Sequence, residues 1–210
     1  MATAATAPVG HVRRSRTLAT SVSETVRERT RKAHVRAEQA LALEERLASR
    51  DAYARLLVRL RGYYVPLEEA LVAWESRSAT EGLDVAARMR AGLLDVDLAV
   101  LGRPHDGSGT AQVTPPVLGD LPQALGWLYV LEGSALGGRV IARRALRRLG
   151  ADLPVAFFTG ADGPDLGGRW RSLRTALDGL GPDAADDVVA AAEAGFALFA
   201  GWLRSEVPPR

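Results

Sequence analysis

Apolar residues recur at helical spacing along most of the chain, most clearly over residues 125–149. The arginines near the end of this run, followed by Gly150, are typical of a helix C-terminus. Three glycines, Gly133, Gly137 and Gly138, nevertheless occupy its centre, where each costs about 0.8–1 kcal/mol relative to alanine. We therefore expect the bare backbone to make an interaction that offsets this cost.

Two interpretations of these glycines remain open on the residues alone. Gly133 and Gly137 lie about one turn apart, so they allow either a second helix or a flat ligand to approach the backbone closely. Helix packing is the ordinary explanation for an isolated pair at this spacing. Tyr129, one turn earlier, and the polar Ser134 favour a ligand site.

The same periodicity predicts further helices over residues 21–45, 51–74, 83–101, 166–180 and 183–204. Ser21 and Glu24 match a capping box at the first start, and Pro66 predicts a kink in the second helix. Residues 102–119 and 151–165 are rich in turn-forming residues and are expected to be loops. Because no alternating strand pattern occurs, we predict an all-α fold.

The composition of the 210 residues, 47% of them hydrophobic, indicates one domain over residues 21–205. Residues 1–20 and 206–210 are expected to be tails. The 27 basic and 25 acidic residues nearly cancel, so no nucleic-acid partner is expected. Without cysteine the chain forms neither a disulfide nor an iron–sulfur cluster, so electrons for any redox reaction must come from another protein or a soluble reductant.

No part of the sequence resembles a targeting or membrane segment. The first twenty residues lack the apolar run of a secretory signal. The most apolar later stretch, residues 188–203, contains Glu193 and is shorter than the roughly 20 residues that span a bilayer. We therefore expect a buried helix there, no membrane partner and a cytoplasmic location.

One histidine of the first predicted helix is a candidate metal ligand. Arg27, His34 and Glu38 are spaced by seven and four residues, which puts them on one helical stripe. A neutral imidazole can bind haem iron while its other N–H donates to an acceptor such as Glu38. On its own, this pattern also fits a histidine on an exposed, charged helix face. His105 and His11 are weaker candidates, because a loop or tail positions an axial ligand poorly.

Two segments resemble bacterial haem oxygenases. The distal helix of this family is similar to residues 129–138, YVLEGSALGG, and the nearest members are those associated with bacteriophytochromes. The proximal helix is similar to residues 25–38, TVRERTRKAHVRAE. The resemblance extends over roughly residues 25–203 and implies a single-domain, multi-helical fold with haem between a proximal and a distal helix.

The resemblance also implies roles for individual residues on the proximal side. His34 matches the iron ligand, and Glu38 matches the acceptor that orients the imidazole. Arg27 and Tyr129 match positions near the haem propionates. Arg171 is the best match to a further propionate-binding residue, although it also fits a solvated basic face; the fork of a guanidinium can donate two parallel hydrogen bonds to a carboxylate.

On the distal side, Gly133, Gly137 and Gly138 match the positions that leave one haem face open to O2. Ser134 is the candidate to hold a proton-delivering water, where mammalian members carry an aspartate. Phe196 matches a residue that walls the pocket, although packing in the core explains it equally well.

The activity implied by the resemblance is oxidative cleavage of haem, which is both cofactor and substrate, with O2 and external electrons. The products are biliverdin, carbon monoxide and ferrous iron. Arg27 and Tyr129 match anchor positions of members that open the α-meso bridge, so biliverdin IXα is the expected isomer. Supply of the bilin to a bacteriophytochrome is expected rather than iron acquisition.

A basic cluster, Arg143, Arg144, Arg147 and Arg148, suggests how an electron donor docks. An acidic ferredoxin would be steered toward such a cluster. The same arginines equally fit a helix end, where cations complement the helix dipole.

Two other classes of protein remain open. A haem carrier or regulatory relative would keep the pocket and His34 without turnover, although the glycines favour oxygen activation. A helical interaction protein that uses its arginine-rich faces would bind no haem.

Overall fold

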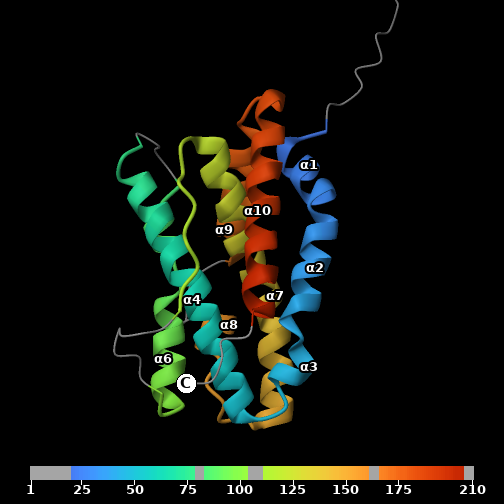
Figure 1. Ribbon diagram of the computed structural model, residues 1–210. Helices are drawn as coiled ribbons and strands as arrows, with labels where there is room; N and C mark the ends of the chain where they lie inside the picture. Colours follow the sequence, from blue (N-terminus) through green and yellow to red (C-terminus); the bar gives the residue numbers. More distant parts are fainter. Residues whose placement is uncertain (1–19, 79–82, 104–110, 161–165, 206–210) are drawn as a thin grey trace, which may run out of the picture.

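The computed structural model describes residues 20–78, 83–103, 111–160 and 166–205, and the regular structure in these ranges is entirely helical (Figure 1). The elements in chain order are α1 (Val22–Arg29), α2 (Arg31–Leu41), α3 (Leu43–Arg46), α4 (Arg50–Glu75), α5 (Val85–Arg88), α6 (Gly92–Val100), α7 (Leu121–Leu149), α8 (Ala156–Thr159), α9 (Leu166–Asp178), the 3-10 turn η1 (Pro182–Ala184) and α10 (Ala185–Arg204). The predicted all-α fold is confirmed.

Two long helices, α7 and α10, pack along each other at the centre of the molecule. Gly126 on α7 permits this approach, because a Cβ there would lie 2.5 Å from the backbone oxygen of Val188 and 2.6 Å from the Cβ of Ala191. Gly195 on α10 is less confined, since a Cβ there would lie 3.0 Å from the side-chain atom Cγ2 of Val130. Gly126 is thus required by the α7–α10 contact, and Gly195 adds to its closeness.

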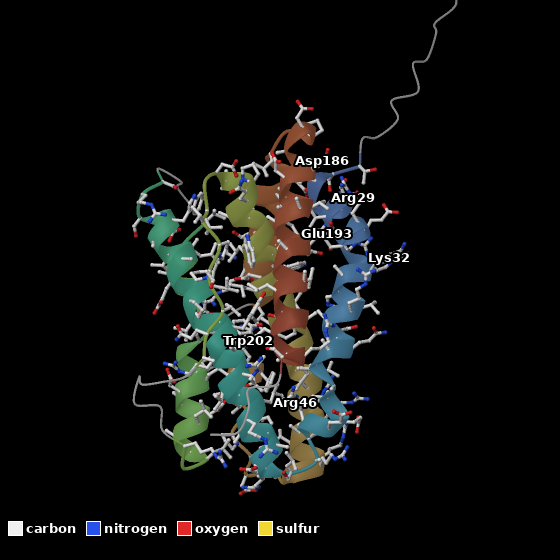
Figure 2. All side chains as sticks on the ribbon, in the orientation of Figure 1. Arg29, Lys32, Arg46, Asp186, Glu193 and Trp202 are labelled. Carbon is white, nitrogen blue, oxygen red and sulfur yellow. The ribbon has the colours of Figure 1, made fainter. Side chains whose placement is uncertain are left out.

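The N-terminal helices α1, α2 and α3 follow α10 along its length (Figure 1). At one end of α10, Arg29 on α1 forms an ion pair with Asp186. At the other end, Arg46 on α3 donates a hydrogen bond of 3.0 Å to the backbone oxygen of Leu203. Figure 2 shows Arg29 beside Asp186 and Arg46 at the opposite end of the same wall. These polar contacts hold the wall formed by α1 to α3 in register with α10.

The helix predicted over residues 125–149 is confirmed and begins four residues earlier, at Leu121. The carboxylate of Asp120 accepts a hydrogen bond of 3.0 Å from the N–H of Gln123, which caps the first turn. Pro122 suits this turn because its missing N–H would have had no partner inside the helix.

The first predicted helix is wrong as one continuous element, because the chain breaks at Thr30 and again at Ala42. The Thr30 hydroxyl donates to the backbone oxygen of Val26 at 2.7 Å, an interaction that tends to bend helices. Ala42 adopts the left-handed region (φ 45°, ψ 51°) and separates α2 from α3. The predicted start is correct, since Ser21 Oγ accepts the N–H of Glu24 at 3.3 Å.

The helix predicted over residues 83–101 is also wrong as one element, because Met89 is extended (φ −70°, ψ 143°) and separates α5 from α6. The Glu68 carboxylate on α4 accepts hydrogen bonds from the N–H groups of Arg90, at 3.1 Å, and Ala91, at 2.9 Å. A side chain from another helix therefore satisfies the backbone at the break.

The remaining boundaries agree with expectation except in one loop. The helix α4 continues through Pro66, and α9 and α10 begin and end within about two residues of the predicted bounds. The predicted loop over residues 151–165 contains α8. The N–H groups of Ala156 and Phe157 donate to the Asp97 carboxylate, each at 2.9 Å, so α8 too is capped by a distant carboxylate.

Within the described ranges, no helix has the length and apolar character needed to cross a membrane. His11, His105, residues 1–19 of the expected N-terminal tail and all of the expected C-terminal tail lie outside the described residues.

The break between α5 and α6 predicts a pH dependence of stability. Glu68 is 7% exposed, and burial raises the pKa of its carboxyl, although the hydrogen bonds from Arg90 and Ala91 and the Arg90 charge oppose the shift. A carboxyl with a raised folded-state pKa binds its proton more tightly in the folded protein. Its contribution to stability is therefore complete below the unfolded-state pKa and is lost as the pH rises through the folded-state pKa.

We expect the free energy of unfolding of the wild type, relative to that of Glu68→Gln, to decrease as the pH rises from about 4 to about 7. Urea unfolding of the haem-free proteins at several pH values measures this difference. An increase in the relative free energy of unfolding of the wild type as the pH rises would show that burial does not raise the pKa of Glu68.

Candidate functional site

A cleft of about 520 Å³ opens between the N-terminal helices and α7, with α10 as its floor. Its lining includes Arg27, Thr30 and His34 from the first wall, Tyr129 from α7 and Phe196 from α10. This volume is within the range of small-molecule and cofactor sites. Four of the residues that the sequence singled out therefore line one cavity.

His34 lies on α2, one turn after the break at Thr30, and its side chain is 50% exposed. Its Nδ1 is 3.8 Å from Glu38 Oε1, which is an ion-pair distance rather than a hydrogen bond. Its ring meets the Phe196 ring edge-on, with centroids 5.5 Å apart. With Nδ1 near the carboxylate, Nε2 is the nitrogen left to bind a ligand.

Cationic groups gather around the Tyr129 hydroxyl. Burial raises the pKa of Tyr129, while a hydrogen bond with Thr30 and the charges of Arg27 and Arg174 act in the opposite direction. Arg174 lies on α9 and donates to Ser23 Oγ of α1 at 3.3 Å. This end of the cleft is therefore suited to carboxylates, and Arg174 joins the predicted Arg27 and Tyr129 there.

Arg171 is exposed on α9, three residues before Arg174. Arg171 was predicted from the resemblance to the family, which gave no reason to prefer Arg174. The proximity of Arg174 to Tyr129 became visible only when α1, α7 and α9 were brought together.

The three glycines at the centre of α7 have different surroundings. A Cβ at Gly138 would lie 2.6 Å from the backbone oxygen of Phe158, so this glycine lets α8 approach. A Cβ at Gly133 would lie 3.8 Å from the Trp170 ring on α9, an ordinary contact. At Gly137 no heavy atom of the described residues comes within 4 Å of that position. Gly137 thus provides open space beside the helix.

Apolar side chains are exposed on α7 beside this open position and on α2. Leu136 and Val140 lie near Gly137 in the sequence and are 43% and 49% exposed, and Val35, next to His34, is 43% exposed. A flat, apolar macrocycle with carboxylate substituents fits this lining, and one histidine is enough to hold its iron because the macrocycle supplies four nitrogens.

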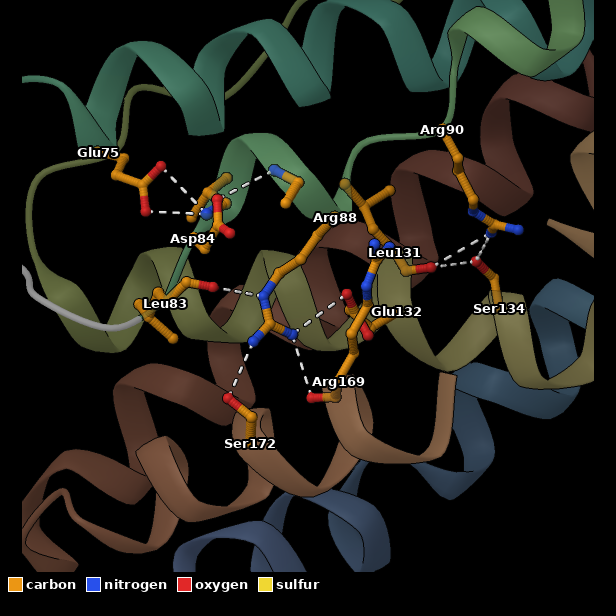
Figure 3. A network of polar contacts seen from close by, with 12 residues as sticks. Glu75, Leu83, Asp84, Arg88, Arg90, Leu131, Glu132, Ser134, Arg169 and Ser172 are labelled. Atoms are coloured by element: carbon orange, nitrogen blue, oxygen red, sulfur yellow. Dashed lines mark hydrogen bonds and ion pairs between the residues drawn. The ribbon is translucent and has the colours of Figure 1, made fainter. Parts of the chain in front are cut away.

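Ser134 belongs to a polar network on the flank of α7 (Figure 3). Its hydroxyl donates to the backbone oxygen of Leu131 at 2.5 Å, accepts from Arg90 Nη2 at 2.6 Å and lies 2.6 Å from the Tyr64 hydroxyl. The Arg90 guanidinium also covers the ring of Phe157, 4.4 Å from its centroid. A cation therefore stands next to Ser134.

The sequence contained no signal for Arg90 in this position, because the extended Met89 that directs it toward α7 was not predicted. Tyr64 and Trp170 were likewise not singled out as site residues. The contacts of all three are made with residues distant in the sequence.

Comparison with known proteins agrees with this geometry. Residues 20–205 match the model of the family described as "Heme oxygenase". The chain belongs to the haem oxygenase family. A "Heme oxygenase" of Xanthomonas campestris is 37% identical over 162 residues, which cover 76% of this chain and 93% of that protein. "Heme oxygenase PigA" of Pseudomonas aeruginosa is 33% identical over 159 residues, covering 72% of this chain and 74% of its own.

Solved structures share the fold at lower identity. A haem oxygenase of Neisseria meningitidis, solved with NO and CO bound, has a TM-score of 0.71 at 20% identity and covers 89% of this chain and 92% of its own. The haem oxygenase of Leptospira interrogans also gives 0.71 at 20% identity, covering 87% and 98%.

The expected family, enzyme class and substrate are therefore confirmed. This haem oxygenase takes haem as substrate and cofactor and cleaves it oxidatively to biliverdin, carbon monoxide and ferrous iron.

The different surroundings of the glycines predict opposite effects of alanine. Gly138→Ala is expected to lower the free energy of unfolding by about 1–3 kcal/mol, because its Cβ meets backbone that cannot move freely. Gly137→Ala is expected to raise it by about 0.5–1 kcal/mol through helix propensity, while it slows biliverdin formation by filling the open space beside the helix.

Urea unfolding of the haem-free proteins and a single-turnover assay measure the two effects. Equal destabilisation by both substitutions would show that Gly137 is also a packing glycine.

Proposed function

We propose that His34 binds the haem iron through Nε2 and that Glu38 orients the imidazole from the Nδ1 side. The proposal is supported by the position of His34 in the cleft, half exposed and with its ring held by Phe196. A carboxylate near the second nitrogen fixes the tautomer and raises the basicity of the ligand.

On the opposite wall, α7 controls access to the other haem face. The missing side chain at Gly137 leaves room for O2 between the macrocycle and the helix backbone. Haem supplies the redox chemistry, with electrons delivered from outside. The protein confines the reaction to one edge of the macrocycle and excludes bulk water, because Leu136 and Val140 line the same face.

Ser134 holds the proton-delivering water through its Oγ. The hydroxyl is bound by Arg90 and lies beside the Tyr64 hydroxyl, so these contacts hold the Ser134 side chain in one rotamer. Because the Ser134 hydroxyl donates to the backbone oxygen of Leu131 and accepts from Arg90, its second lone pair accepts either from Tyr64 or from this water. Arg90 stays protonated and orients the network rather than transferring protons.

The propionates are held by Arg27, Tyr129 and an arginine of α9, for which Arg171 and Arg174 are the two candidates. The cations near the Tyr129 hydroxyl support this anchor. Arg27 and Tyr129 match the anchors of family members that open the α-meso bridge, so the proposed product is biliverdin IXα. The enzyme acts in the cytoplasm and supplies this bilin to a bacteriophytochrome, a use supported by the resemblance of residues 129–138. Chromophore assembly on an added phytochrome apoprotein tests that use.

Reconstitution with haem tests the iron ligand. The wild type is expected to show a Soret band that disappears after reductant is added in air, while a biliverdin spectrum appears. His34→Ala is expected to lose most of this turnover, because the axial ligand is missing. Chromatography of the product identifies the isomer.

Two results would contradict the proposal. A wild-type Soret band that survives the reductant would indicate a haem carrier. A His34→Ala variant with wild-type spectra and rates would mean that another group binds the iron.

The electron donor is proposed to be an acidic ferredoxin that docks on the exposed arginines of the second half of α7. Arg144 and Arg148 are already paired with Glu44 of α3. Arg143 and Arg147 are exposed on the same helix, and Arg139 lies one turn before them. We therefore assign docking to these three residues rather than to the cluster as a whole.

Reversing two of these charges tests the docking surface. Arg143→Glu with Arg147→Glu is expected to slow ferredoxin-driven turnover about tenfold at low salt and to leave ascorbate-driven turnover unchanged. Added salt should reduce the difference, because it screens exposed charges. Arg77→Glu, just beyond the end of α4, is the control and should behave as the wild type. Equal losses with both reductants would remove the docking proposal.

A further inference from the structure

A buried ion pair lies directly beside the distal glycines. Arg88, the last residue of α5, faces Glu132 of α7, with 3.3 Å between Nη1 and Oε1. Their side chains are only 5% and 7% exposed. Glu132 immediately precedes Gly133 and lies three residues after Tyr129, which lines the cleft.

The guanidinium of Arg88 joins three parts of the fold (Figure 3). Nε donates to the backbone oxygen of Leu83 at 2.6 Å. Nη1 donates to the backbone oxygen of Arg169 at 3.1 Å, and Nη2 donates to Ser172 Oγ at 3.0 Å. One side chain therefore links the start of α5, the middle of α7 and two positions of α9.

The α9 residues between these two contacts are Trp170 and Arg171. Trp170 packs with its ring 5.2 Å from that of Tyr129 and lies against Gly133. Arg171 is one of the two candidate propionate anchors. Arg88 binds Arg169 and Ser172, the residues on either side of Trp170 and Arg171. These hydrogen bonds therefore determine the distance and the register of α9 relative to α7.

Stability alone does not account for such a pair. Removing two charges from water costs several kcal/mol, and well-packed apolar residues are often as stable as a buried ion pair. The ion pair also orients the surrounding helices, because the planar guanidinium requires each hydrogen-bond acceptor to lie in a defined position.

We propose that Arg88 and Glu132 are positioning residues that fix α9 against α7 and thereby set the in-plane rotation of haem. The rotation decides which meso carbon faces the glycines, and hence the bilin isomer. The inference rests on the proposed function, since it assumes that α9 supplies a propionate anchor.

The double variant Arg88→Met with Glu132→Leu tests the inference. It replaces the pair by apolar side chains of similar length and leaves no buried charge without a partner. We expect a folded protein in which the minor bilin isomer increases about tenfold relative to the wild type. The haem methyl resonances of the ferric cyanide complex, measured by NMR, should show a second in-plane rotation without any turnover.

Two further variants separate positioning from general loosening. Arg88→Lys keeps the charge opposite Glu132 but cannot reach all four acceptors, so an intermediate isomer ratio is expected. Arg61→Met with Asp95→Asn removes the ion pair between α4 and α6 and should leave both readouts unchanged.

A folded double variant with the wild-type isomer ratio and a single haem rotation would overturn the inference. Ser172→Ala, which removes only one of the α9 contacts, provides the same test if the double variant does not fold. A wild type that binds haem without making biliverdin would contradict the proposed function, while the NMR spectra would still decide whether the ion pair sets the rotation.

Discussion

The cleft depends on the packing of α10 against both of its walls. The backbone of α10 lies close to α7 at Gly126, and α10 also packs along α2. The walls pack against α10 far more than against each other. Their separation is therefore set by a third element, and the cleft between His34 and Tyr129 remains open. Val35 on α2 and Leu136 and Val140 on α7 remain exposed. The free energy that burial of these side chains would provide is available to a ligand.

The glycines of α7 reconcile the two interpretations that the sequence left open. Gly126 and Gly138 allow neighbouring backbone to approach, from α10 and from the residues of α8. Gly137 faces open space and offers a surface to a ligand. A single helix thus uses the same residue type for packing at Gly126 and Gly138 and for access at Gly137. The cost in helix propensity is offset by close packing at the first two positions and, we propose, by haem at the third.

The features predicted correctly from the sequence are those that depend on local patterns of residues. The period of apolar residues identified α4, α7 and α10, and helical spacing put Arg27, His34 and Glu38 on one wall. The breaks at Thr30, Ala42 and Met89 were missed, because the propensities around them favour helix and the interactions that compensate come from tertiary structure. Glu68 is a clear example, since it satisfies backbone N–H groups 22 and 23 residues away. The positions of Arg90, Trp170 and Arg174 follow from such long-range contacts and had no local signal.

The break at Met89 is what allows one short segment to hold α7 on both sides of Gly133. Residues two apart on a continuous helix point in nearly opposite directions, so Arg88 and Arg90 would not both reach the same neighbouring helix. The extended Met89 removes this restriction. Arg88 then contacts Glu132 and Arg90 contacts Ser134, the residues immediately before and after the glycine. The cost of interrupting the helix is offset by the Glu68 carboxylate, so three charged side chains from outside α7 determine where Gly133 lies.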